Sequence, residues 1–113
     1  ISNPTWANHN GVFTAAGIEI AQYSYYNAET KDKDFDAMLT DLQSASEGDV
    51  VLLHGCCHNP TGANLNLAQW QEVVDLLNAQ GLIPMIDIAY QGFGDGLEED
   101  AAGVRLVASS TQE

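Results

Sequence analysis

The stretch that decides the fold reads Asp49-Val50-Val51-Leu52-Leu53-His54-Gly55-Cys56-Cys57-His58-Asn59-Pro60-Thr61-Gly62. A short apolar run leads into a polar loop, and the amphipathic segment 67–80 follows. This order predicts a strand, a loop and a helix. Ligands of open α/β sheets bind beyond the carboxyl ends of the strands. Loop 54–62 is therefore predicted to border a binding site.

A second apolar run, residues 82–88, predicts another strand, which opens onto a polar segment. The helix between the two runs has clear end signals. Asn66 followed by Gln69 is typical of a capping box, and Gly81 is typical of a helix C-terminus. A strand, a helix and a strand within this length predict a parallel pair with a right-handed crossover. The apolar face of the helix is expected to consist of Leu67, Trp70, Val73, Val74 and Leu77.

The remaining segments predict shorter elements around this unit, and the fold class is therefore α/β. Apolar spacing, alternation and glycine stops give the following expected elements. They are a helix at 9–16 that ends at Gly17, a strand at 18–26, a loop at 27–34, a helix from Phe35 that ends at Gly48, and a helix at 98–109.

The composition excludes several classes of partner. Sixteen acidic residues face only Lys31, Lys33 and Arg105, which gives a net charge of −13. Neither nucleic acid nor an anionic membrane is expected to bind such a chain. No apolar run approaches the roughly 20 residues of a membrane span. The only two cysteines are adjacent, a geometry that rarely forms a disulfide, so we expect a reducing, cytoplasmic location.

Loop 54–62 contains four residue types that zinc favours, in His54, Cys56, Cys57 and His58. However, strand-like alternation would send neighbouring side chains to opposite faces, and the spacing lacks the pattern of strong zinc motifs. A nucleophilic cysteine would need a positioned base, which sequence adjacency does not establish. We therefore predict no metal site and interpret both cysteines as small buried residues.

Asp87 is the most informative acid because it ends an apolar strand. A buried carboxylate is costly unless it meets a cation or several donors. It could be a helix cap or a loop acid, or it could hold a protonated ring nitrogen. Tyr90 and Asn59 offer donors near the same strand ends, and Trp6 offers either a flat stacking face or ordinary core packing.

These motifs together resemble the fold-type I, class I pyridoxal-phosphate aminotransferases, in particular the aspartate and aromatic amino acid aminotransferases. The matching stretches are NPTWANH at 3–9, HGCCHNPTG at 54–62, DIAYQGF at 87–93 and GLEEDA at 96–101. The likeness covers essentially the whole chain. It implies a three-layer α/β/α fold with a mostly parallel sheet, of which residues 1–113 form part of the large cofactor-binding domain, with no second domain in this chain.

The resemblance implies roles for six residues toward pyridoxal 5′-phosphate. Asp87 matches the aspartate that pairs with the pyridine nitrogen. Tyr90 and Asn59 match the residues that hydrogen-bond the phenolic oxygen, and Trp6 matches the tryptophan stacked on the ring. His9 matches a histidine that hydrogen-bonds the aspartate. His54 is expected close beneath the cofactor.

Three family features are absent from the sequence. The family's Schiff-base lysine lies in a Ser-x-x-Lys stretch that is expected beyond Glu113, and neither lysine of the chain matches it. Residues 107–110 are interpreted as the end of the last helix, with 111–113 leading toward the strand that precedes this lysine. The phosphate cradle and the substrate-binding arginines are also missing. We therefore expect an internal fragment of a longer protein that is inactive by itself.

The resemblance implies that the parent protein exchanges an amino group between an L-amino acid and a 2-oxo acid. Aspartate and 2-oxoglutarate are the expected pair, and a homodimer is the expected assembly. The quoted motifs do not separate an aspartate from an aromatic preference. Two other readings remain open: a lyase or decarboxylase that uses the same cofactor and fold, and a non-catalytic acidic interaction module.

Overall fold

The computed structural model describes residues 1–110. Its central unit consists of β5 (Val50–His54), α3 (Leu67–Gln80) and β6 (Ile83–Asp87). The two strands pair in parallel, with Val50 opposite Ile83 and His54 opposite Asp87. This confirms the predicted parallel pair and brings both polar strand ends to one edge.

The ends of α3 also confirm the sequence prediction. Asn66 and Gln69 form a complete capping box, and Gly81 ends the helix in the left-handed conformation that glycine adopts without strain. Trp70, Val73, Val74 and Leu77 are buried, as expected. Leu67 was expected in the same apolar face but is 57% exposed; it is the first residue of the helix.

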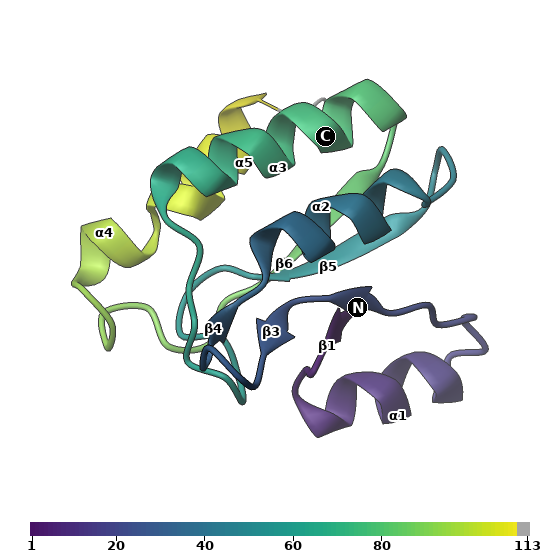
Figure 1. Ribbon diagram of the computed structural model, residues 1–113, viewed down its shortest axis with the longest axis horizontal. Helices are drawn as coiled ribbons and strands as arrows, with labels where there is room; N and C mark the ends of the chain where they lie inside the picture. Colours follow the sequence, from purple (N-terminus) through teal and green to yellow (C-terminus); the bar gives the residue numbers. More distant parts are fainter. Residues whose placement is uncertain (111–113) are drawn as a thin grey trace.

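The helices cover the central strands from different sides. Figure 1 shows α3 and α5 (Ala102–Ser110) along one side of the β5–β6 pair, with α1 (Ala7–Ala15) on the other side. α2 (Phe35–Gln43) packs against α3, and its N-cap residue Asp34 accepts a hydrogen bond from the Ala37 N–H through its side chain. The main core lies between these helices and the strands and includes Met38, Leu42, Val51, Leu53, Trp70, Val73, Val74, Leu77, Leu82 and Val107.

Four expected elements differ from the structure. The predicted strand at 18–26 is present only as β2 (Tyr23–Ser24) and β3 (Tyr26–Asn27), because β2 pairs with β1 (Ser2–Asn3) and β3 pairs with a different partner. That partner is β4 (Asp32–Lys33), which lies inside the predicted loop 27–34. Such two-residue strands depend on tertiary contacts that the alternation pattern does not contain.

The other two differences concern helix ends. α2 ends at Gln43, with Ser44 as its C-cap, and so stops well before the expected Gly48. The predicted helix 98–109 is divided into α4 (Leu97–Asp100) and α5, with a break at Ala101. Residues 107–110 end α5, as expected, whereas the predicted lead into a further strand at 111–113 lies outside the described residues. No helix within residues 1–110 has the length and apolarity needed to cross a bilayer.

Candidate active site

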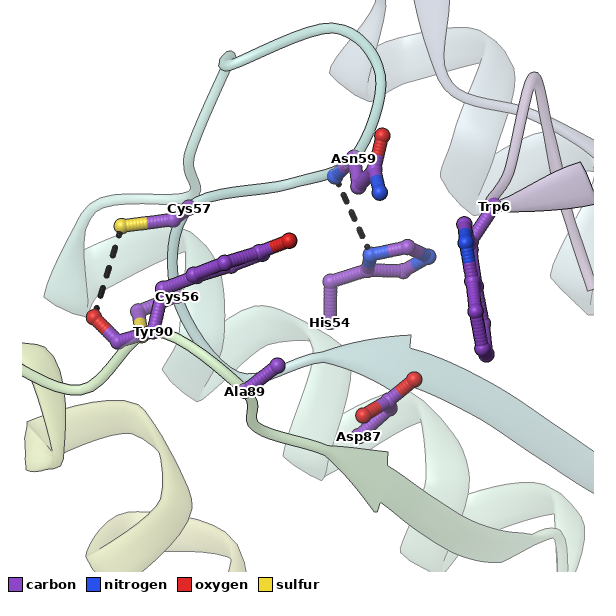
Figure 2. A pocket seen from close by; sticks show the side chains of 8 residues that line it. All are labelled: Trp6, His54, Cys56, Cys57, Asn59, Asp87, Ala89 and Tyr90. Atoms are coloured by element: carbon purple, nitrogen blue, oxygen red, sulfur yellow. Dashed lines mark hydrogen bonds between the residues drawn. The ribbon is translucent and has the colours of Figure 1, made fainter.

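A pocket of about 150 Å³ opens at the carboxyl ends of β5 and β6. Figure 2 shows Asp87 and Trp6 at one end of this pocket and Tyr90 with the two cysteines at the other. The pocket lining consists of Trp6, His54, Cys56, Cys57, Asn59, Asp87, Ala89 and Tyr90. The structure thus brings all four predicted cofactor-binding residues to one place.

Asp87 ends β6 with its carboxylate at the pocket. One carboxylate oxygen, Oδ2, lies 2.7 Å from His9 Nε2, and His9 itself is buried in α1. The Asp87 side chain is 38% exposed. Its other oxygen, Oδ1, has no hydrogen-bond partner among residues 1–110. One oxygen is therefore held in place while the other is free to bind a ligand.

A continuous chain of hydrogen bonds connects the backbone of Asn59 to Asp87. The Asn59 N–H donates to His54 Nδ1 at 3.3 Å, so His54 carries its proton on Nε2. That proton is donated to Thr5 Oγ1 at 3.0 Å, and Thr5 Oγ1 is also hydrogen-bonded to His9 Nδ1 at 2.8 Å. His9 then donates from Nε2 to Asp87. The Asn59 N–H thus fixes the ring tautomer of His54 and the direction of its hydrogen bond to Thr5.

Burial keeps His54 neutral, as this chain of hydrogen bonds requires. Desolvation, helped by the neighbouring His9, lowers the pKa of His54 to about 4, against the opposing effect of Asp87. At neutral pH His54 therefore has one ring proton and one acceptor nitrogen. It can donate to Thr5 and accept from Asn59 at the same time.

His58, which belongs to loop 54–62, is packed beneath the site. It is buried, and its ring stacks between Tyr25 and His54 with 4.0 Å between ring centroids on each side. Its Nε2 lies 3.1 Å from Ser2 Oγ, and its Nδ1 lies 2.8 Å from Thr61 Oγ1. Desolvation lowers the pKa of His58 to about 3, so it also stays neutral. Neither His54 nor His58 belongs to the group of possible metal-binding atoms that the described residues bring together, which consists of Cys56, Cys57 and Asp100.

Trp6 forms the outer side of the pocket. Its ring meets His9 edge-on, with 5.3 Å between centroids and an angle of 89°. The residue is 43% exposed and so is not the core tryptophan that one reading of the sequence allowed. An open aromatic face beside a carboxylate suits a flat, positively charged ring.

Tyr90 and Asn59 supply further polar groups. In Figure 2 the Tyr90 ring extends into the pocket and the Asn59 side chain lies across from Asp87. Neither the Tyr90 hydroxyl nor the Asn59 amide has a hydrogen-bond partner within the described part of the chain. Both groups remain available to a ligand.

Asp100 holds the loop that carries Tyr90. Its buried carboxylate accepts backbone N–H groups from Gly92 at 2.8 Å and from Gly94 and Asp95 at 2.9 Å each. These hydrogen bonds lower the pKa of Asp100 and keep it ionised, and the bond from Asp95 has the largest effect. Thr5 and Asp100 lie in two of the stretches that match the family, at 3–9 and 96–101, but sequence reasoning assigned neither of them a role.

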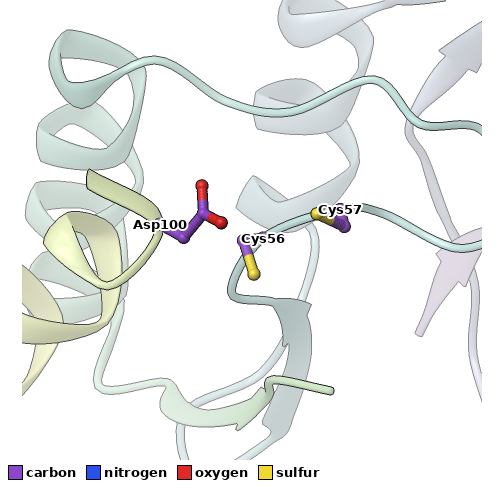
Figure 3. Close-up of side chains that lie close together, drawn as sticks. All are labelled: Cys56, Cys57 and Asp100. Atoms are coloured by element: carbon purple, nitrogen blue, oxygen red, sulfur yellow. The ribbon is translucent and has the colours of Figure 1, made fainter. Parts of the chain in front are cut away.

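The two cysteines do not follow the alternation expected from the sequence. Cys57 has a φ of 47°, in the left-handed region, so the two side chains are not sent to opposite faces. The two sulfur atoms and an Asp100 carboxylate oxygen all lie within 4.8 Å of one another (Figure 3). Cys56 is buried, as predicted, and desolvation raises its pKa to about 11, whereas Cys57 is only half-buried.

A family model described as aminotransferase class I and II matches residues 1–112. An aromatic-amino-acid aminotransferase of Paracoccus denitrificans is 57% identical over the whole chain, which covers 29% of that relative. An aspartate aminotransferase of Escherichia coli (strain K12) is 52% identical, again over the whole chain and 28% of the relative. The chain thus spans less than a third of these curated relatives.

Solved structures of aminotransferases are also similar to this chain. An aromatic amino acid aminotransferase with 3-indolepropionic acid matches with a TM-score of 0.95 and 58% identity, over 96% of this chain and 28% of that one. An aromatic-amino-acid aminotransferase from Burkholderia pseudomallei, described as covalently bound to pyridoxal phosphate, matches with a TM-score of 0.94 and 52% identity. That match covers 96% of this chain and 27% of the other.

Proposed function

This chain belongs to the class I and II aminotransferase family, and from that premise we propose that the protein containing it transfers an amino group from an L-amino acid to a 2-oxo acid. Aspartate is the proposed donor, 2-oxoglutarate the acceptor and pyridoxal 5′-phosphate the cofactor. Residues 1–113 contribute part of the large, cofactor-binding domain.

One observation carries this proposal. The Asp87 carboxylate is held by His9 through one oxygen and presents the other to a pocket with an open aromatic face. Within residues 1–110 no Lys or Arg forms an ion pair with Asp87. A pyridinium nitrogen supplies the missing positive charge, so the donor set fits this cofactor.

Asp87 keeps a proton on the ring nitrogen because a carboxylate stabilises the adjacent positive charge. Bound here, pyridoxal phosphate supplies an electron sink for the carbanion at the substrate's α carbon. His9 orients the carboxylate. His54 and Thr5 orient His9 in turn, through hydrogen bonds of 3.0 and 2.8 Å.

The opposite side of the pocket binds the phenolic oxygen of the cofactor. The Asn59 amide and the Tyr90 hydroxyl both have free donors there, and two donors favour the ionised oxygen over the protonated one. Trp6 stacks on the ring and excludes water from one of its faces. These side chains therefore bind, orient and tune the cofactor, while other residues carry out proton transfer.

The lysine that moves the proton is proposed to lie in the longer protein, after Glu113. Among residues 1–110 no lysine lines the pocket, and Lys33 pairs with Asp32 at 3.6 Å. The phosphate cradle and the substrate-binding arginines are proposed to lie outside residues 1–113 as well. We also propose a homodimer located in the cytoplasm.

Aromatic amino acids are a second candidate class of donor. Several relatives are named aromatic-amino-acid aminotransferases, including the one with 57% identity. None of the eight pocket residues distinguishes the two donors, since these side chains surround the position of the cofactor ring and not that of the substrate side chain.

The test uses the full-length protein, purified with pyridoxal phosphate. Its kcat/KM is measured with 2-oxoglutarate and either aspartate or phenylalanine as donor. Transamination with aspartate preferred supports the proposal, and a preference for phenylalanine assigns the second class. Decarboxylation or elimination without amino transfer would assign a different enzyme of this fold. If the full-length protein did not bind the cofactor at all, a non-catalytic acidic interaction module would be the remaining interpretation.

A further inference from the structure

Cys56 and Cys57 form a pair of sulfur donors at one end of the pocket, and the proposed function gives them no role. The left-handed backbone at Cys57 brings the two thiols together, within 4.8 Å of each other and of an Asp100 oxygen. Neither cysteine is in a disulfide. Figure 2 shows both cysteines beside Tyr90, in the pocket wall.

The distance between the sulfurs suits one shared metal ion. A metal–thiolate bond is about 2.3 Å long, so a two-coordinate ion spans sulfurs up to about 4.6 Å apart. The two sulfurs lie within 4.8 Å of each other, so they are already close to that span. Cys57 also borders the open pocket, which gives an ion a path from solvent.

The other donors nearby restrict the type of ion. Asp100 already accepts three backbone N–H groups, and the nitrogens of His54 and His58 are hydrogen-bonded elsewhere. Only two thiolates therefore remain. Zinc requires about four ligands, and magnesium and calcium require oxygen donors, whereas copper(I) is selected by soft sulfur ligands.

We propose that Cys56 and Cys57 together bind one soft, monovalent cation of the copper(I) class at the Tyr90 end of the pocket. Each thiol loses its proton as its metal–sulfur bond forms, so two protons are released for each ion and no oxidation occurs. Cys57 Sγ now donates to the Tyr90 carbonyl at 3.8 Å, a weak contact that the ion would replace. The site exists whether or not the protein is an aminotransferase.

The test is an oxygen-free titration of the full-length protein with copper(I), in competition with the chromophoric chelator bicinchoninate. The wild type is expected to bind one equivalent more than Cys57→Ser and Cys56→Ser, because a hydroxyl is a poor ligand for copper(I). Zinc(II), titrated in the same way against a zinc dye, should show no such difference. Equal copper binding by the wild type and both variants would overturn the proposal, as would a site filled by zinc in preference to copper.

A second measurement needs no variant and so does not depend on how well the variants fold. Wild-type protein is alkylated with iodoacetamide with and without copper(I), and the peptide that contains both cysteines is quantified by mass spectrometry. At free copper(I) about ten times its Kd, alkylation of Cys57 should slow about tenfold, because only the unbound site reacts. An unchanged rate at this peptide would contradict copper binding there.

Discussion

The two ends of the pocket are built differently, although residues of both ends come from the carboxyl ends of β5 and β6 or from the loops that follow them. At the Asp87 end (Trp6, His54 and Asp87, with His9 behind), the key carboxylate belongs to a strand and accepts a 2.7 Å hydrogen bond from a buried histidine. At the Tyr90 end (Cys56, Cys57 and Tyr90), the key side chain lies in a loop and is 47% exposed.

The difference shows how rigidity is distributed in this site. The Asp87 end is fixed by sheet pairing and by a polarised chain of hydrogen bonds that reaches Asn59. The Tyr90 end is positioned indirectly, by weak sulfur contacts and by the hold of Asp100 on the following residues. We therefore expect changes at the Asp87 end to abolish function and changes at the Tyr90 end to adjust it.

The largest effect is expected for Asp87→Asn in the full-length protein. The amide keeps the size of the side chain but removes the negative charge that is proposed to hold a proton on the cofactor nitrogen. By analogy with the loss of a preorganised charge or donor in other active sites, kcat/KM should fall by about 10²–10³-fold. Glu72→Gln, an exposed acid on α3, is the matched control and should leave kcat/KM unchanged. Comparable activity in the two variants would contradict the assigned role.

Acid should destabilise the fold through His54 and His58 before most carboxylates titrate. His54 and His58 have pKa values of about 4 and 3 in the fold, below the usual 6.5. As pH falls from 6.5 toward 4, the unfolded chain takes up protons that the folded chain does not. The free energy of unfolding should then fall by up to about 1.4 kcal/mol per pH unit for each histidine.

This pH dependence is measured by urea unfolding at pH 7, 6 and 5. His58→Phe is the control, since it keeps an aromatic ring between Tyr25 and His54 but cannot take up a proton. The variant should be less stable overall but show a smaller decrease with acid. Parallel curves for the two proteins would mean that His58 titrates alike in the folded and unfolded chain.

Thr5→Val breaks the hydrogen-bond chain at its middle without changing side-chain shape. The His54 Nε2–H loses its acceptor and His9 Nδ1 loses its hydrogen-bond partner. The free energy of unfolding should fall by about 1–3 kcal/mol, as for other unsatisfied buried groups, and kcat/KM by about tenfold. Thr5→Ser keeps the hydroxyl and should retain most of both. If the valine variant matched the serine variant, Thr5 would have no connecting role.

The Asp87 end was predictable from the sequence to the extent that it depends on local signals. The apolar runs, the capping box and Gly81 predicted β5, α3 and β6, and these strands place Asp87 and loop 54–62 together. Thr5 was not predictable, because its link to His54 joins residues 49 positions apart in the sequence. The same holds for β1 and β2, whose two-residue pairing depends entirely on tertiary contacts.

The Tyr90 end was less predictable because its geometry depends on backbone conformation. Strand-like alternation failed at Cys57, where a positive φ brings neighbouring sulfurs together. The continuous helical pattern at 98–109 concealed the break at Ala101. That break follows Asp100, whose carboxylate binds the Tyr90 loop and not the helix start. In both cases the local residue pattern failed where the backbone departs from regular strand or helix geometry.

The smallest effect is expected for Asp100→Asn, which tests whether the Tyr90 end is indeed the adjustable one. An asparagine has one acceptor oxygen, so it cannot hold the N–H groups of Gly92, Gly94 and Asp95 together. Tyr90 should then be less well placed, and the Kd for pyridoxal phosphate should rise about threefold, the cost of about one net hydrogen bond.

A purely structural role for Asp100 would lower stability without changing the cofactor's environment. The pH dependence of the bound cofactor's absorbance separates the two cases, because Tyr90 is proposed to tune the phenolic oxygen. We expect that titration to shift in Asp100→Asn but not in Asp95→Asn, where only the backbone N–H takes part. If Asp100→Asn were as damaging as Asp87→Asn, the two ends would be equally rigid. Tyr90 would then have to be regarded as fixed by its loop as firmly as Asp87 is fixed by its strand.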